Sequence, residues 1–235
     1  MAELQRVLGQ LGFDAGRVDG IFGPATARAL AEFQENYGLK NDGVGGYETF
    51  DALRRVGGRV ADRPSVAAVR EQEALRSLTP RLARKRVALG CFGGLDGLSR
   101  TLGRQLRSAG ASVAEVDGEA SAQAASANRF GADVYLGISA AQRCSVAYYK
   151  VPGFESHGGR RLAVEVCEHV FATGFPPMEP QGMRLPVLRE TRMPAVVVEL
   201  GPVRDVVERA GPLAEALAAA IRQWVVVPVD PRPTT

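Results

Sequence analysis

The sequence lacks the features that mark several common protein classes. Its three cysteines are odd in number and form no CxxC pair, which argues against a disulfide framework and a cysteine zinc knuckle. The net charge of +3 comes without a long basic tract, so nucleic acid is not an expected partner. No run of 18 apolar residues occurs, and a membrane-spanning helix is therefore not expected.

The beginning of the sequence also lacks the pattern of a secretory signal. Met1 leads straight into an amphipathic segment, without a basic stretch followed by an apolar one. Unpaired thiols are typical of a reducing compartment. We therefore expect a cytoplasmic protein, or an extracellular one if the N-terminus is truncated.

An internal repeat is the first positive signal. Residues 19–30 and 42–53 both read D-G-[IV]-x-G-x-x-T-x-x-A-L. Each copy is a glycine-rich turn that leads into a helix, and Pro24 suits a first helical turn because its missing N–H costs nothing there. Apolar residues recur at helical spacing before each turn. Residues 1–56 are therefore predicted to form a small three-helix module.

The rest of the chain alternates between strand and helix patterns. A linker at 57–85 contains a short helical stretch at 66–78, and a seven-residue tail follows at 229–235. Between them, 86–228 is predicted to be an α/β domain with a mostly parallel sheet and helices on both faces. Strands are expected at 86–90, 112–116, 132–139, 146–150 and 195–200, and helices at 98–109, 120–130, 160–172 and 211–224. Ligands of such sheets lie beyond the carboxyl ends of the strands.

Two stretches of sequence carry a family resemblance. LQRVLGQLGF, VDGIFGPATARALAEFQ and GLKNDGVGGYETFDAL together resemble the peptidoglycan-binding type 1 module. MPAVVVELG at 193–201, GADVYLGISA at 131–140 and RVALGCFGG at 86–94 resemble zinc-dependent N-acetylmuramoyl-L-alanine amidases of type 3. The order of module, linker and amidase-like domain is most similar to that of the actinobacterial CwlM-type group.

The resemblance implies a site, which this sequence has altered. In the family, two histidines and a glutamate hold zinc, the metal activates water, and a further glutamate on the last strand handles the proton. That last glutamate corresponds to Glu199, whereas the two histidine positions hold Phe92 and Ser139. The segment that should carry the glutamate ligand is missing after Gly94. We therefore expect Glu199 to be a vestige of the family's catalytic site. We also expect the protein to bind no zinc and no other cofactor.

Other readings of these residues remain open. The alternative for Glu199 is a structural carboxylate at a strand end, paired with an arginine or with backbone N–H groups. The nearest arginines in the sequence are Arg189, Arg192 and Arg204. The two histidines, His157 and His169, are expected to be surface or structural residues. A rebuilt metal cluster would have to combine residues far apart in the sequence, namely Cys91, Cys144, His157 and Glu199.

Candidate ligand-binding residues of the small module lie in or beside its turns. They are Asp19, Phe22, Tyr37 and Tyr47. The alternative for each of them is a structural role in a turn or in the core.

Three functions fit this sequence. The first is a non-catalytic amidase homologue that binds peptidoglycan or its muropeptide-containing precursors and regulates or scaffolds cell-wall synthesis, together with a protein partner from that process. The resemblance supports it, because some CwlM-type proteins act inside the cell as regulators. The alternative is an active zinc-dependent amidase that cleaves the muramoyl–L-alanine amide. The third is an interaction protein that has lost glycan binding.

Overall fold

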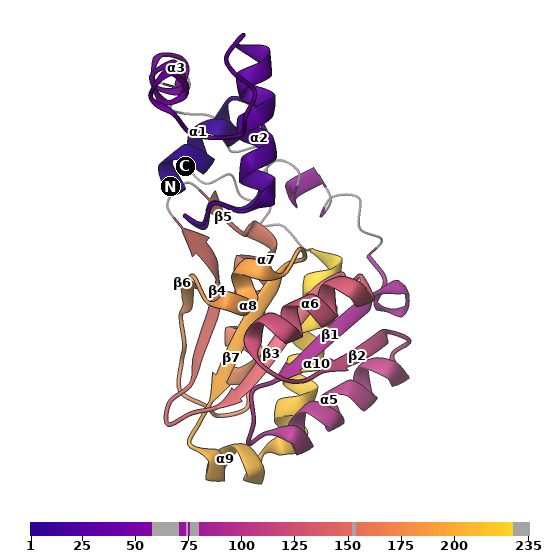
Figure 1. Ribbon diagram of the computed structural model, residues 1–235. Coiled ribbons are helices and arrows are strands. Elements are labelled where there is room, and N and C mark those ends of the chain that lie inside the picture. Colours follow the sequence, from indigo (N-terminus) through magenta and orange to yellow (C-terminus); the bar gives the residue numbers. More distant parts are fainter. Residues whose placement is uncertain (58–70, 74, 76–79, 152–153, 228–235) are drawn as a thin grey trace. The chain divides into compact units, whose positions relative to one another are not determined.

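A computed structural model describes residues 1–57, 71–73, 75, 80–151 and 154–227 (Figure 1). They form two compact units, of which the first contains Met1–Glu73 with Lys150–Glu155 and the second Ala74–Tyr149 with Ser156–Thr235. The expected helix at 66–78 lies largely outside the described residues, although 71–73 and 75 are helical. The expected tail at 229–235 also lies outside them. Within the described residues, no helix is long and apolar enough to span a membrane.

The N-terminal module consists of three helices, as the sequence predicts. They are α1 (Ala2–Gln10), α2 (Pro24–Asn36) and α3 (Tyr47–Gly57). Their apolar faces meet in a small core around Leu8, Leu30 and Phe33, none of which is accessible to solvent. Pro24 occupies the first turn of α2, where a missing backbone donor costs nothing.

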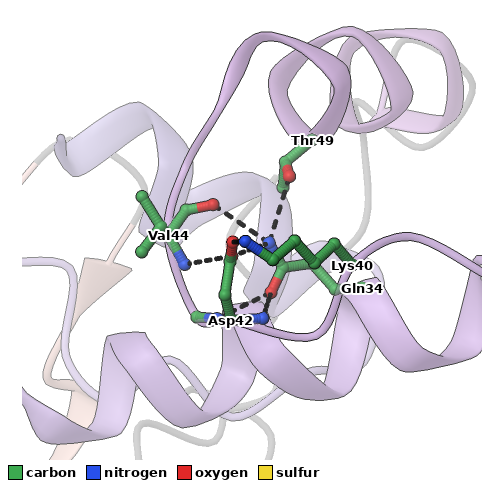
Figure 2. A network of polar contacts seen from close by, with 6 residues as sticks. Gln34, Lys40, Asp42, Val44 and Thr49 are labelled. Atoms are coloured by element: carbon green, nitrogen blue, oxygen red, sulfur yellow. Dashed lines mark hydrogen bonds and ion pairs between the residues drawn. The ribbon is translucent and has the colours of Figure 1, made fainter.

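A buried glutamine anchors each glycine-rich turn of the module. The Gln34 side-chain amide donates hydrogen bonds to Asp42 Oδ1 at 3.0 Å, the Val44 carbonyl at 3.0 Å and Thr49 Oγ1 at 3.1 Å (Figure 2). Its carbonyl oxygen accepts from the backbone N–H groups of Asp42 and Gly43 at 3.2 and 2.8 Å. Because every polar group of this buried amide is paired, the network stabilises one turn geometry.

The same network occurs in the first copy of the repeat. Gln5 donates to Asp19 Oδ1 at 2.8 Å, the Ile21 carbonyl at 3.0 Å and Thr26 Oγ1 at 3.1 Å. The Gly20 N–H donates back to Gln5 Oε1 at 2.7 Å. The Asp and Thr of the repeated motif are therefore turn-forming residues, held by a glutamine that lies outside the motif.

The strands form a seven-stranded sheet. They are β1 (Arg86–Cys91), β2 (Ser112–Val116), β3 (Val134–Ala140), β4 (Ser145–Val151), β5 (Phe154–Glu155), β6 (Pro180–Met183) and β7 (Ala195–Leu200). The sheet belongs to the second unit except for β5 and the last two residues of β4. The order is β2-β1-β3-β7-β4-β5, with β6 beside β4. β1, β2, β3 and β7 are parallel, whereas β4 runs antiparallel to β7.

Helices cover both faces of this sheet (Figure 1). The helices are α5 (Asp96–Ser108), α6 (Ala120–Phe130), α7 (His157–Phe171), α8 (Pro186–Glu190), α9 (Val203–Glu208) and α10 (Ala210–Val226). The main core lies between one sheet face and α5, α7 and α10. Trp224 of α10 is fully buried there and donates its indole N–H to the Gly158 carbonyl at 2.9 Å. The opposite face carries α6, joined to the sheet through Gln123 and Tyr135.

The predicted fold class is confirmed, with local differences. The strands at 112–116 and 195–200 and the helix at 120–130 have the expected bounds. Helix α7 begins three residues earlier than expected, because the Ser156 side chain caps it by accepting from the Gly159 N–H at 3.1 Å. Four short elements, β5, β6, α8 and α9, were not expected.

The Gln34 network is expected to contribute to the stability of the N-terminal module. Gln34→Ala leaves two backbone N–H groups, one carbonyl and one hydroxyl without this partner, so we expect the free energy of unfolding of the module to fall by about 2–4 kcal/mol. Hydrogen exchange of the amides of Asp42 and Gly43 measures the loss directly. The control is Glu35→Ala, an exposed neighbour on α2. Equal protection of these amides in the two variants would contradict the prediction.

Candidate functional site

Four side chains form a line across the carboxyl edge of the sheet, which we call the carboxyl-edge row: Phe92, Ser139, Glu199 and Ser145. Ser139 of β3 is the register partner of Glu199 of β7, which also pairs with Ser145 of β4. Phe92 directly follows β1 and donates its backbone N–H to the Ile138 carbonyl at 2.9 Å, which places it beside Ser139. Since neighbouring strands lie about 4.8 Å apart, residues at successive positions of the row are adjacent. The three predicted positions are thus brought together, and Ser145 is an addition.

The Phe92 ring lies over the sheet at Gly137. A Cβ atom at Gly137 would lie 2.9 Å from Phe92 Cε2 and 2.9 Å from the Tyr135 hydroxyl oxygen. The Tyr135 hydroxyl donates to Gln123 Oε1 at 2.7 Å, and both residues are fully buried. Burial, followed by the nearby Cys91, raises the pKa of Tyr135, which keeps the phenol neutral. The floor of the site is therefore a closed, uncharged network with an aromatic ring above it.

The Glu199 carboxylate accepts a hydrogen bond from a serine hydroxyl and is otherwise exposed to solvent. Ser145 Oγ donates to Glu199 Oε2 at 2.8 Å, and the Glu199 side chain is exposed. The expectation of an arginine partner is wrong within the described residues, because Arg189 pairs with Glu190 and Arg204 pairs with Glu208. The physical reason is exposure, since a carboxylate that remains in water needs no counter-ion.

The donor set of the carboxyl-edge row does not fit zinc. Catalytic zinc sites use about three nitrogen, sulfur or carboxylate ligands, and the row offers one carboxylate, two hydroxyls and a phenyl ring. No group of three or more His, Cys, Asp or Glu residues suited to a metal occurs in the described parts of the chain, so the rebuilt cluster is not formed there. The Nδ1 atom of His169 lies 2.8 Å from the Glu165 carbonyl oxygen of its own helix.

The predicted ligand residues of the module occupy different environments. Asp19 Oδ1 accepts from Gln5 and from the Ile21 N–H at 2.8 Å each, so it belongs to the turn. The Tyr37 ring stacks on Phe33 with centroids 4.5 Å apart. Phe22 is 44% exposed and Tyr47, the first residue of α3, is 83% exposed. Tyr47 is therefore the most accessible of the four candidates.

The sequence patterns did not point to five residues that contribute to these sites, namely Gln5, Gln34, Gln123, Tyr135 and Ser145. The two module glutamines precede the turn aspartates by 14 and 8 residues, so their positions do not follow the spacing of the repeat. Ser145 had no signal in the sequence, because its role depends on pairing with a strand more than 50 residues away.

Comparison with known proteins agrees with this architecture. Residues 1–53 match the family described as "Putative peptidoglycan binding domain". The N-acetylmuramoyl-L-alanine amidase CwlM of Mycobacterium tuberculosis is 33% identical over 279 aligned positions, covering 100% of this chain and 68% of that protein. The chain belongs to the N-acetylmuramoyl-L-alanine amidase family. Since the alignment is longer than the 235-residue chain, this family member lacks segments that its mycobacterial relative has.

Solved structures show the same fold for the amidase-like unit. The amidase Ami1 from Mycobacterium smegmatis superposes with a TM-score of 0.54 at 17% identity, covering 62% of this chain and 98% of that structure. The amidase AmiC2 of Nostoc punctiforme gives 0.51 at 18% identity, covering 60% and 97%. The module alone is 51% identical over 51 residues to a spore cortex-lytic enzyme of Bacillus cereus, covering 22% of this chain and 20% of that enzyme.

The adjacency within the row can be tested by building a metal site. In the double variant Phe92→His, Ser139→His, two imidazoles would stand beside the Glu199 carboxylate, which gives three ligands of suitable type. We expect it to bind about one Co²⁺ or Zn²⁺ per chain, measured by cobalt absorption and elemental analysis. The control is Phe92→Leu, Ser139→Ala, which opens the same space without ligands. Equal metal content in the two variants would argue against the arrangement.

Proposed function

We propose that this amidase homologue is non-catalytic, binds peptidoglycan or its muropeptide-containing precursors, and regulates or scaffolds cell-wall synthesis with a protein partner. The observation that carries the proposal is the donor set of the carboxyl-edge row. Of its four side chains, only Glu199 is a good zinc ligand, and this carboxylate already accepts a hydrogen bond from Ser145. A water molecule at this edge would lack the metal that lowers its pKa in the family.

The geometry around Phe92 gives the proposal further support. Its ring and the Tyr135 hydroxyl lie where a side chain at Gly137 would be. A metal site in the carboxyl-edge row would therefore require removal of the Phe92 ring as well as the introduction of metal ligands. The exposed Glu199 and the half-buried Ser145 still offer a polar edge that can bind an amide or a hydroxyl group of a wall fragment.

The module supplies the more direct argument for a cell-wall ligand. Its family is described as a putative peptidoglycan binding domain, and its two glutamine networks stabilise turns from which apolar side chains project. Ile21, Phe22, Val44 and Tyr47 are between 41% and 83% exposed. Exposed apolar and aromatic side chains on rigid turns are typical of a binding surface. The expected cytoplasmic location and the protein partner remain predictions.

Loss of catalysis is tested on purified full-length protein supplied with zinc. We expect no release of stem peptides from muropeptides and far less than one zinc per chain, because the row lacks ligands. The variant Glu199→Gln should behave like the wild type, whereas an active type 3 amidase serves as positive control. Hydrolysis that a chelator abolishes and Glu199→Gln removes would refute the proposal and establish the active-amidase alternative.

Wall binding is tested by co-sedimentation with purified peptidoglycan. We expect Tyr47→Ala to weaken binding by about fivefold or more, as removal of an exposed aromatic anchor does. Its unfolding temperature should not change, since the side chain is 83% exposed. Phe171→Ala is the matched control, because Phe171 is an exposed aromatic residue of the other unit. If the wild type neither sediments nor gains thermal stability from muropeptides, the interaction-protein hypothesis replaces this one.

A further inference from the structure

A cavity of about 450 Å³ lies beyond the carboxyl end of β7, within the second unit. Its walls come from the β3–β4 turn, the segment after α7, and the segment from Gly201 to Arg209 that contains α9. Cys144 faces this cavity and packs against the main core, whereas its neighbour Ser145 bonds to Glu199. No residue of the carboxyl-edge row lines the cavity. The volume falls within the range of about 300–1,000 Å³ found for small-molecule sites.

The cavity is lined by an acidic and a basic side chain that form no ion pair within the described residues. Asp205 and Arg143 both line it, and within the described part of the chain neither side chain has an ion-pair or hydrogen-bond partner. Arg143 is exposed and Asp205 is half-buried, so water solvates both and they carry no large burial cost. They are therefore available to a ligand that carries complementary charges.

The remaining walls combine apolar side chains with polar groups. Arg209 donates to the Gly174 carbonyl at 3.0 Å and lies over the Phe175 ring at 5.3 Å, which fixes one wall. Pro176, Pro177 and Pro202 add surfaces without backbone donors. Preorganised walls lower the entropy that is lost when a ligand binds.

The Cys144 thiol supports binding rather than covalent chemistry. Its sulfur accepts from the Gly201 N–H at 3.4 Å and donates to the Gly201 carbonyl at 3.3 Å. Burial raises the pKa of Cys144, the Gly201 N–H opposes this, and the Asp205 carboxylate raises it further. A protonated thiol is a poor nucleophile. Asp205 and Cys144 line the same cavity.

We infer that this cavity binds a small zwitterion, either an amino acid or a short peptide with free termini. The amine pairs with Asp205, the carboxylate pairs with Arg143, and the apolar walls accept the side chains. This inference goes beyond the proposed function and does not rest on it, because none of these residues belongs to the carboxyl-edge row or to the module.

Calorimetric titration of the full-length protein with alanyl-alanine, as the L,L and the D,D isomers, tests the inference. We expect saturable binding in the millimolar range or tighter by at least one isomer. Asp205→Asn and Arg143→Gln should each weaken it by about threefold to tenfold. Arg204→Gln is the matched control, because Arg204 is an exposed residue of α9 that pairs with Glu208 and does not line the cavity. Thermal unfolding should confirm that all three variants fold.

Blocked ligands assign each charge. The N-acetylated dipeptide lacks the amine, so wild type and Asp205→Asn should bind it equally. The C-terminal amide lacks the carboxylate, so wild type and Arg143→Gln should bind it equally. Absence of binding by both isomers, or binding that neither variant weakens, would overturn the inference. These results do not depend on Tyr47, so failure here and failure of the proposed function are distinguishable.

Discussion

The register of the central strands is the constraint on which the chemistry of the amidase-like unit depends. Parallel pairing of β1, β3 and β7 brings three segments spread over more than 100 residues to one edge, and antiparallel pairing of β4 adds a fourth. The side chains at these strand ends become neighbours, because the strand spacing is nearly invariant. In this protein those side chains are a phenyl ring, two hydroxyls and a carboxylate, so the edge offers polarity without a metal-binding set.

The module depends on a comparable constraint at a smaller scale. A helical core of this size buries little apolar surface, so turns with free backbone groups would leave its loops poorly defined. The amides of Gln5 and Gln34 supply donors and an acceptor to the turn beside each of them. In the second copy, the pKa of Asp42 is lowered, first by the Val44 N–H and then by the Gln34 amide. The shared Asp and Thr of the repeat thus take part in a hydrogen-bond network, whereas the shared Ile21 and Val44 are exposed apolar side chains of the same turns.

Prediction from sequence succeeded where the signal was local and long. The run at 195–200 contains three consecutive valines and only one polar residue. The helix at 120–130 ends at Gly131, which adopts a left-handed conformation with φ of 65°. Helices α8 and α9 have five and six residues, too few to show helical periodicity. Strand β6 reads PQGM and has no β-branched residue, so only its pairing with β4 makes it a strand. The Ser145–Glu199 contact is likewise non-local.

The alternation of strand residues explains how such a fold persists without the family's zinc ligands. Leu136, Ile138, Val196 and Val198 point into the core shared with α5, α7 and α10. Ser139 and Glu199, one position further along, point to the opposite face. Substitutions in the carboxyl-edge row therefore leave the packing of the core unchanged, and surface changes of this kind alter stability by about 0.5 kcal/mol or less. Phe92 adds apolar contact over Gly137. Stability and metal chemistry are thus encoded on separate faces, and the first does not require the second.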